Sequence, residues 1–393
     1  MMVKEKYLYP CIVALYAIAM LYSVLLGLTH PNRNWDMICY LGSVVSWQEK
    51  TPETIYSTSM GIVKDTMPDW LYQQFIENPL SSSPAAYIQQ LPFCQVKPLY
   101  NVSMWFFHQT GMALTTASWV TSTVSFAILA ILLFLWRPHC MGRSAWLLMV
   151  LALAFFWEDW PFATLARFST PDALCTMLCI AALFAWLERK SFRYFCLFGL
   201  LATLARPDSI IPLGIYTAYF ATLAPKPQRA PLFDAVFFCA LLLISNVVVK
   251  HITQGPNYTY EHFYIYSFFN KNPNPATMSD HLTFDMYWQS FTVGLKDFFT
   301  LPRTIMLVII SLAGGFSYYM RPAPGKANRL WLDLLLVTWG AWAVRFILWP
   351  AALENRFYYG YCLVILFASG ELIAPFTASA WKILQTFRKQ LNS

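Results

Sequence analysis

Residues 9–28 read YPCIVALYAIAMLYSVLLGL, and the chain continues at residues 29–37 with THPNRNWDM. The first stretch contains no charged side chain, and it has the length that one membrane-crossing helix needs. It is too long for a removable signal peptide and lacks a small-residue cleavage site, so we expect it to remain as the first span. The polar residues that follow indicate that the chain leaves the membrane there.

The rest of the chain repeats this pattern. Of 393 residues, 58% are apolar and only 12% are charged, whereas soluble domains carry about 25% charged residues. Apolar runs of roughly 15 to 22 residues recur along the sequence. They predict an all-α polytopic membrane protein with about ten transmembrane helices. The expected spans lie near 9–28, 116–136, 144–157, 173–187, 194–205, 209–224, 231–250, 302–320, 330–350 and 357–375.

Basic residues predict the orientation. The short segments on the N-terminal side of the membrane hold 15 of the 27 Lys and Arg residues, and the longer opposite loops hold 15 of the 20 acidic residues. The positive-inside rule therefore places both termini in the cytoplasm, and the net charge of +7 is no sign of nucleic-acid binding. We expect one transmembrane domain, residues 1–393, with large outer loops at 29–115 and 251–301. Amphipathic surface helices are expected near 36–50, 68–77 and 98–113.

The nine cysteines include no C-x-x-C pair and no zinc-like spacing. Most lie in apolar runs, where cysteine packs as a small hydrophobic residue. Cys39 and Cys94 share the first outer loop. A disulfide and two free thiols are both compatible with that placement.

Asp36 is the first acidic residue after the first span. A carboxylate beside a membrane is costly unless it is solvated or paired, which makes it a functional candidate. At the membrane surface it would lie near a lipid phosphate and could take a proton from an incoming hydroxyl as a general base. The alternative is structural, because aspartate before an apolar run suits the N-cap of a helix.

A second polar patch holds Glu158, Asp159, Arg167 and Asp172 in a short outer loop between the third and fourth expected spans. These groups could bind a metal ion, position an acceptor or hold a phosphate. Asp172 follows Thr170-Pro171, which is typical of a helix start. Helix capping can explain Asp172 but hardly both Glu158 and Asp159.

A third patch, Ala205-Arg206-Pro207-Asp208, forms the tight turn between the fifth and sixth expected spans. Arg206 and Asp208 either pair with one another or leave Arg206 facing an anionic ligand. Arg345 lies about five residues inside the outer end of the ninth expected span, where a lone arginine needs an anionic partner or water.

Two further basic residues flank expected spans on the outer side. Lys97, in Lys97-Pro98-Leu99-Tyr100, is a candidate phosphate ligand, with a snorkelling lysine as the alternative. Arg356 precedes the last span and is placed for a phosphate or for pairing with Glu354. The chain has no Walker loop, no G-x-G-x-x-G after a strand, no nucleophile elbow and no H-E-x-x-H. Outward-facing phosphate ligands suit a lipid-linked phosphate better than a nucleotide.

The order and sidedness of these motifs resemble the GT-C superfamily of membrane glycosyltransferases, which use polyprenyl-phosphate sugar donors. The resemblance covers the topology of nearly the whole chain, from a cytoplasmic N-terminus through one span to a long outer loop with surface helices. Asp36 falls where such enzymes keep a functional acid, and Glu158 and Asp159 fall where they often have further acids. The other matching segments are Lys97-Pro98-Leu99-Tyr100, Arg167…Asp172 and Ala205-Arg206-Pro207-Asp208.

The resemblance implies a GT-C-like bundle and an inverting displacement at the anomeric carbon, with a glycan, lipid or protein as acceptor. Asn34-Trp35-Asp36 supplies a single acid rather than an Asp-x-Asp pair, so dependence on a divalent cation such as Mg²⁺ or Mn²⁺ stays open. The implied site residues are Asp36, Glu158 and Asp159 for catalysis; Lys97, Arg167, Arg206, Arg345 and Arg356 for the donor phosphate; and Asp172 and Asp208 for positioning the acceptor.

Compactness favours a bacterial inner membrane, with the active site on the periplasmic side. A lipid or glycolipid transporter, or flippase, is the main alternative. Transporters commonly show internal repeats and polar groups near the bilayer midplane, whereas here the polar residues gather at the outer edge. A non-catalytic scaffold would leave the buried Arg345 and the Arg/Asp turns unexplained.

Overall fold

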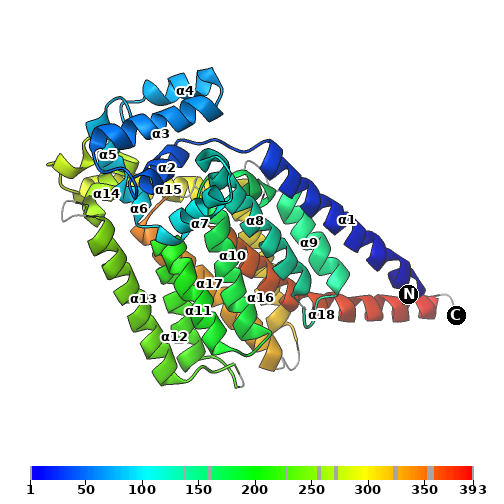
Figure 1. Cartoon of the computed structure of the whole chain (residues 1–393). Helices are drawn as coiled ribbons and strands as arrows, with labels where there is room; N and C mark the ends of the chain where they lie inside the picture. Colours follow the sequence, from blue (N-terminus) through cyan, green and yellow to red (C-terminus); the bar gives the residue numbers. More distant parts are fainter. Residues whose placement is uncertain are drawn as a thin grey trace.

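The protein folds into a helical bundle with a helical cap at one end (Figure 1). Within the part of the chain that the computed structural model describes, every named element is a helix, and the one extended contact is an isolated bridge between Asn32 and Phe168. The described residues are 2–136, 138–156, 162–226, 228–254, 258–269, 273–321, 326–351 and 358–391.

The bundle helices coincide, to within a few residues at most ends, with the apolar segments predicted as spans. Proline begins α16, as expected at a position where no backbone N–H is needed. The bundle consists of α1 (Met2–Thr29), α8 (Leu114–Leu135), α9 (Arg143–Phe156), α10 (Asp172–Leu187), α11 (Phe192–Ala205), α12 (Ile210–Thr222), α13 (Leu232–Thr253), α16 (Pro302–Tyr319), α17 (Lys326–Leu348) and α18 (Tyr359–Leu391), with the short turns η1 (Phe162–Arg167) and η2 (Pro207–Ser209).

Not all of these helices are long enough to cross a membrane. The 14 residues of α11 extend about 21 Å, less than the hydrocarbon core of about 30 Å. The helices indicate an α-helical membrane protein, and the ten-span arrangement stays a prediction. Among the described residues, four helices are long and apolar enough, and a bent pair of helices would make a fifth span: Leu8–Thr29, Leu114–Leu135, Leu232–Thr253, Asn328–Leu348, and Phe284–Thr300 with Pro302–Tyr319.

The cap is built from the two large loops between bundle helices. Helices were expected near 36–50, 68–77 and 98–113, and α2, α4 and α7 lie there. The residues of α2 from Met37 to Val45 are all buried, so α2 forms the core of the cap instead of lying on a surface. The cap consists of α2 (Asp36–Val45), α3 (Pro52–Thr66), α4 (Asp69–Ile76), α5 (Pro84–Gln90), α6 (Pro92–Gln95), α7 (Pro98–Gln109), α14 (Tyr260–Phe268), η3 (Pro275–Thr277) and α15 (Phe284–Thr300).

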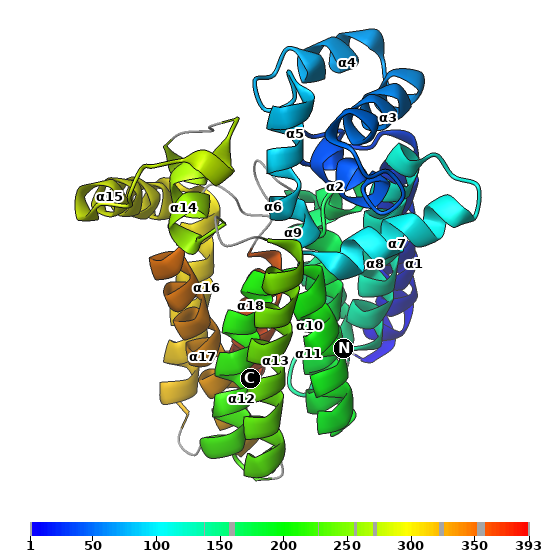
Figure 2. The same ribbon diagram turned by 60° about the vertical axis from the view of Figure 1, so that its left-hand side comes forward.

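Polar contacts join the two loops of the cap. The side chain of Gln90 donates to the carbonyl of Pro273 at 3.0 Å, and the side chain of Gln89 donates to that of Asn274 at 3.2 Å. Gln89 also accepts from the backbone N–H of Ala276 at 3.2 Å and, through its carbonyl, from the Tyr258 hydroxyl at 2.8 Å. The loops therefore form one cap over the end of the bundle (Figure 2).

Candidate functional site

Four charged residues, which we call the Arg206 cluster, meet at the end of the bundle that lies next to the cap. Asp172 is the first residue of α10, and Arg345 lies in the last turn of α17. Arg206 and Asp208 belong to the turn that joins α11 to α12. The cluster thus brings together three segments that are far apart in the sequence.

Arg206 and Arg345 share the carboxylate of Asp208. Arg206 donates to it twice, from Nε to Oδ1 and from Nη2 to Oδ2, both at 3.0 Å. Arg345 donates to Oδ2 from Nη2 at 2.8 Å and from Nε at 3.2 Å. Arg206 also pairs with Asp172 through Nη1. The pairing of Arg206 with Asp208 is therefore present, and the partner that Arg345 required is the same acid.

Burial makes these pairings necessary. The side chains of Asp172 and Arg345 are 1% and 5% exposed, and that of Asp208 is 32% exposed. Burial alone would raise the pKa of Asp208, but the adjacent guanidinium groups of Arg206 and Arg345 outweigh it and hold that pKa below its usual range. Asp208 is therefore ionised at neutral pH, and its carboxylate is the most exposed part of the cluster.

Tyr358 and Thr170 complete the surroundings of the cluster. Arg345 donates from Nη1 to the hydroxyl of Tyr358 at 3.0 Å, and its guanidinium lies 4.7 Å from the centre of that ring. The hydroxyl of Thr170 donates to the carboxylate of Asp172. Neutral hydroxyl groups thus hold the two outer ends of the network, the guanidinium group of Arg345 and the carboxylate of Asp172.

A cavity of about 50 Å³ opens beside the Arg206 cluster. Arg206, Asp208 and Arg345 line its polar end, and apolar side chains of α10, α12 and α18 line the remainder, among them Ile180 and Leu213. A water molecule needs about 10–15 Å³ measured in this way, so the cavity holds a few waters. The cavity therefore provides a small space beside the two guanidinium groups of the cluster.

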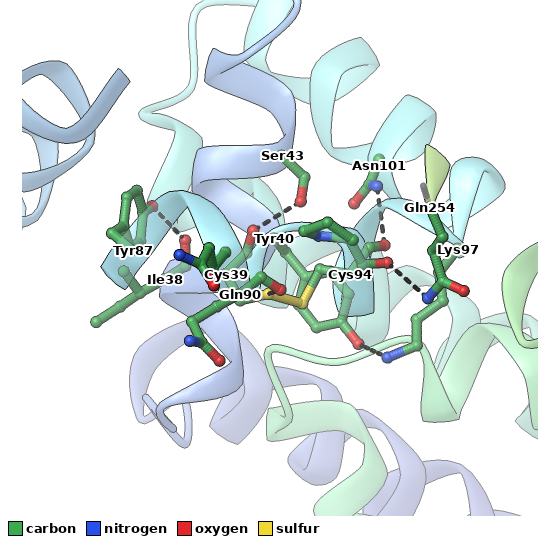
Figure 3. The surroundings of a disulfide bond; sticks show 12 residues. Ile38, Cys39, Tyr40, Ser43, Tyr87, Gln90, Cys94, Lys97, Asn101 and Gln254 are labelled. Carbon is green, nitrogen blue, oxygen red and sulfur yellow. Dashed lines mark hydrogen bonds between the residues drawn. A yellow bond between two sulfur atoms is a disulfide. The ribbon is translucent and has the colours of Figure 1, made fainter. Parts of the chain in front are cut away.

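Lys97 approaches the same region from the cap. Its ammonium group donates to the hydroxyl of Tyr40 at 2.6 Å and lies 4.9 Å from the centre of that ring (Figure 3). Burial, followed by the positive charge of Arg206, lowers the pKa of Lys97 to about 8, while Asp36, Asp172 and Asp208 act in the opposite direction. Lys97 is therefore within electrostatic range of Asp36 and of the Arg206 cluster.

A disulfide between Cys39 and Cys94 holds Lys97 and Tyr40 together (Figure 3). The structure thus has the bond and not the pair of free thiols. Cys39 precedes Tyr40 in α2, and Cys94 lies in α6, three residues before Lys97. The bond therefore fixes the two backbone segments that carry the Lys97–Tyr40 pair.

Removing this disulfide should loosen the cap. The bond joins residues 55 positions apart, so a Cys39→Ala/Cys94→Ala variant should lose about 2–4 kcal/mol of stability through the greater freedom of the unfolded loop. Thermal unfolding and limited proteolysis of the cap measure the effect. Cys11→Ala, which changes an exposed cysteine of α1, is the matched control. Equal melting temperatures for the two variants would contradict the expectation.

Asp36 is the first residue of α2, and Trp35 occupies the N-cap position. Asp36 is therefore in the first turn, where an acid interacts favourably with the helix dipole, and does not itself cap the helix. Its charge raises the pKa values of Tyr40 and of Tyr266 in α14, in both cases after the larger effect of burial. Its charge also raises the pKa of Tyr100 in α7, so Asp36 lies among groups from α2, α7 and the second loop of the cap.

Arg167, predicted as a ligand of the donor phosphate, contacts the backbone of the linker that follows α1. Its Nε donates to the carbonyl of His30 at 2.7 Å, and its own carbonyl accepts from the N–H of Asn32 at 2.7 Å. The hydroxyl of Ser169 also donates to the carbonyl of Asn32 at 2.9 Å. Arg167 therefore holds the linker that leads from α1 to Asp36 against the end of η1.

Three predicted site residues, Glu158, Asp159 and Arg356, lie outside the described residues. Among the residues that are described, no group of three His, Cys, Asp or Glu side chains is placed to hold a metal ion. The question of Mg²⁺ or Mn²⁺ therefore stays open.

Sequence reasoning missed the tyrosines of the site. Tyr40 lies four residues after Asp36, so both project from one face of a helix, and this spacing was the available signal. Tyr266 and Tyr358 gave no such signal, since only packing brings them to the site. Comparison of the chain with protein-family models, curated proteins and solved structures found no match.

Proposed function

We propose that this protein is a GT-C type glycosyltransferase that moves a sugar from a polyprenyl-phosphate donor to an acceptor hydroxyl. In this proposal the chain crosses a bacterial inner membrane about ten times, with both termini in the cytoplasm. The cap and the Arg206 cluster then face the periplasm. The shorter bundle helices would cross with a tilt, or through a locally thinned bilayer.

One observation carries the proposal: Arg206 and Arg345 line a cavity with largely apolar walls, and Lys97 lies within electrostatic range of both Arg206 and Asp36. Guanidinium and ammonium groups are the usual protein ligands of phosphate. Apolar walls suit a lipid tail, and a carboxylate suits proton removal. A phosphate linked to a lipid satisfies all three features with one ligand.

The reaction follows from these roles. An acceptor hydroxyl oxygen attacks the anomeric carbon, and the bond from that carbon to the phosphate oxygen breaks. Its electron pair leaves with polyprenyl phosphate, while Asp36 takes the hydroxyl proton. Lys97, Arg206 and Arg345 stabilise the charge that grows on the phosphate. Asp172 and Asp208 position the two guanidinium groups, which refines their expected role beside the acceptor.

A direct assay tests this function. Purified protein in lipid nanodiscs would be given polyprenyl-phosphate sugars and a panel of glycan, lipid and peptide acceptors. Free polyprenyl phosphate and a glycosylated acceptor should form in equal amounts. A flippase leaves the bond between the sugar and the phosphate intact. If the donor crossed the membrane of sealed vesicles unchanged, and no acceptor caused release of polyprenyl phosphate, the transferase proposal would be refuted and the flippase supported.

The low pKa of Lys97 predicts a pH profile. Protonated Lys97 binds the phosphate, so kcat/KM for the donor should fall as the pH rises through about 8. A Lys97→Arg variant keeps its charge at every accessible pH, and its profile should stay level across this range even if its overall activity is lower. A fall near pH 8 that persists in the variant would assign the titration to another group.

A further inference from the structure

Helix α15 has three distinct sides. One side packs on the protein: Ser290 and Gly294 are buried, and Gly294 lies against the backbone of Pro350. On the same side Phe291 packs against Phe346, with ring centres 5.6 Å apart, and Phe298 packs against Trp339 at 6.3 Å. This contact fixes how the helix is rotated about its own axis.

A second side is apolar and exposed. The residues of this stripe are spaced so that, at 3.6 residues per turn, they lie within about 60° of one another around the helix. They are Phe284, Trp288, Leu295 and Phe299, with exposed fractions of 73%, 52%, 37% and 63%.

The third side is polar, with Asp285, Gln289, Thr292 and Lys296 all exposed. Val293 is a single apolar residue among them, which is ordinary for a surface. The two charges on this side have opposite signs, so it offers no positive patch for anionic lipids. A narrow apolar stripe between a packed side and a polar side is the pattern of a helix lying at a membrane–water interface.

The direction of α15 agrees with that pattern. The axis of α15 makes an angle of 68° with that of α16, which follows after a short break at Leu301. In Figure 2, α15 extends sideways from the end of the bundle, whereas α16 runs along it. The exposed side of α16 is also apolar, with Ile309 59% and Leu312 67% exposed. If α16 crosses the membrane with the average tilt of about 20°, α15 lies within about 40° of the membrane plane.

We infer that α15 is an interfacial helix whose apolar stripe rests on the acyl chains of the outer leaflet, continuous with the lipid-facing side of α16. The position of Trp288 in the stripe fits the enrichment of tryptophan at membrane interfaces. This inference does not depend on the proposed transferase activity.

The contacts of α15 connect this interfacial helix to the rest of the cap. The hydroxyls of Ser290 in α15 and Tyr264 in α14 are hydrogen bonded. From α14, the ring of Tyr266 stacks on Phe93 of α6, with ring centres 4.8 Å apart. The second loop is thereby held between the membrane surface and the first loop, close to Asp36.

Depth measurements test this inference. Trp288 and Phe299 would be replaced, one at a time, by the fluorescent residue acridonylalanine in the full chain, with Lys296 as the matched position on the polar side. Each variant would be placed in phosphatidylcholine nanodiscs. Quenching would be compared among iodide, lipids brominated near the headgroup end of the acyl chain and lipids brominated near its middle.

Positions 288 and 299 should be quenched most by lipids brominated near the headgroup end and little by iodide, and position 296 should show the reverse order. Adding phosphatidylglycerol should leave the quenching by the brominated lipids unchanged. Three results would overturn the inference. Stronger quenching of position 288 by lipids brominated near the middle of the chain would mean a re-entrant helix, and equal quenching of positions 288 and 296 by iodide would mean a helix in water. No quenching of position 288 by any agent would mean that protein covers the stripe. Using two stripe positions guards against a variant that does not fold.

Discussion

Replacing Asp36 with asparagine is expected to lower the turnover number of sugar transfer by about 10²–10⁴-fold, the usual contribution of a general base. Asparagine has nearly the same shape but cannot take the acceptor proton. The Lys97–Tyr40 hydrogen bond and the Arg206 cluster involve other side chains, so donor binding should change much less than turnover. Single-turnover kinetics, combined with a separate measurement of donor affinity, would separate the two effects.

Asp69→Asn is the matched control for this variant. Asp69 is the first residue of α4, as Asp36 is of α2, but Asp69 is exposed. The control removes the same favourable interaction with a helix dipole, worth about 0.3–1 kcal/mol, without touching the site. If Asp36→Asn kept the turnover of the control, Asp36 would not be the base, even if the protein proved to be a glycosyltransferase.

An Arg206→Met variant is expected to lose about 3–5 kcal/mol of stability, because it removes the guanidinium group that pairs with the buried carboxylate of Asp172. Asp208 keeps Arg345, so the loss arises mainly at Asp172. The melting temperature in nanodiscs should therefore fall strongly, and donor binding should weaken in whatever fraction remains folded.

Arg193→Met provides the comparison. Arg193 lies on the same helix, α11, near its other end, and is exposed, so its replacement should change stability by less than about 1 kcal/mol. A second variant, Asp172→Asn/Arg206→Met, removes both charges of the buried pair and should recover part of the loss. If the single and double variants had the same melting temperature, the Asp172–Arg206 pair would not account for the loss of stability.

The positions of the bundle helices were predictable because apolar runs bounded by prolines and charges report helix ends directly. The depth of Arg345 likewise predicted that this residue needs an acidic partner. That the partner is Asp208 was not predictable, because 137 residues separate Arg345 from Asp208 and only the packing of α17 beside α12 brings them together. Helix α2 differs most from the prediction. Its sequence pattern is that of a half-exposed helix, but neighbouring cap helices cover the side that was expected to be exposed.

The contacts between the two loops of the cap have a consequence for how the chain is made. The partners of Gln89 and Gln90 in the second loop lie 169 to 187 residues later in the sequence. At about 5–20 residues per second, a ribosome needs roughly 10–40 seconds to supply them. During that interval the first loop is complete, but the second loop, which it contacts in the folded protein, has not yet been synthesised. The Cys39–Cys94 bond requires only residues already synthesised, so oxidation can secure the early half of the cap until its other half arrives.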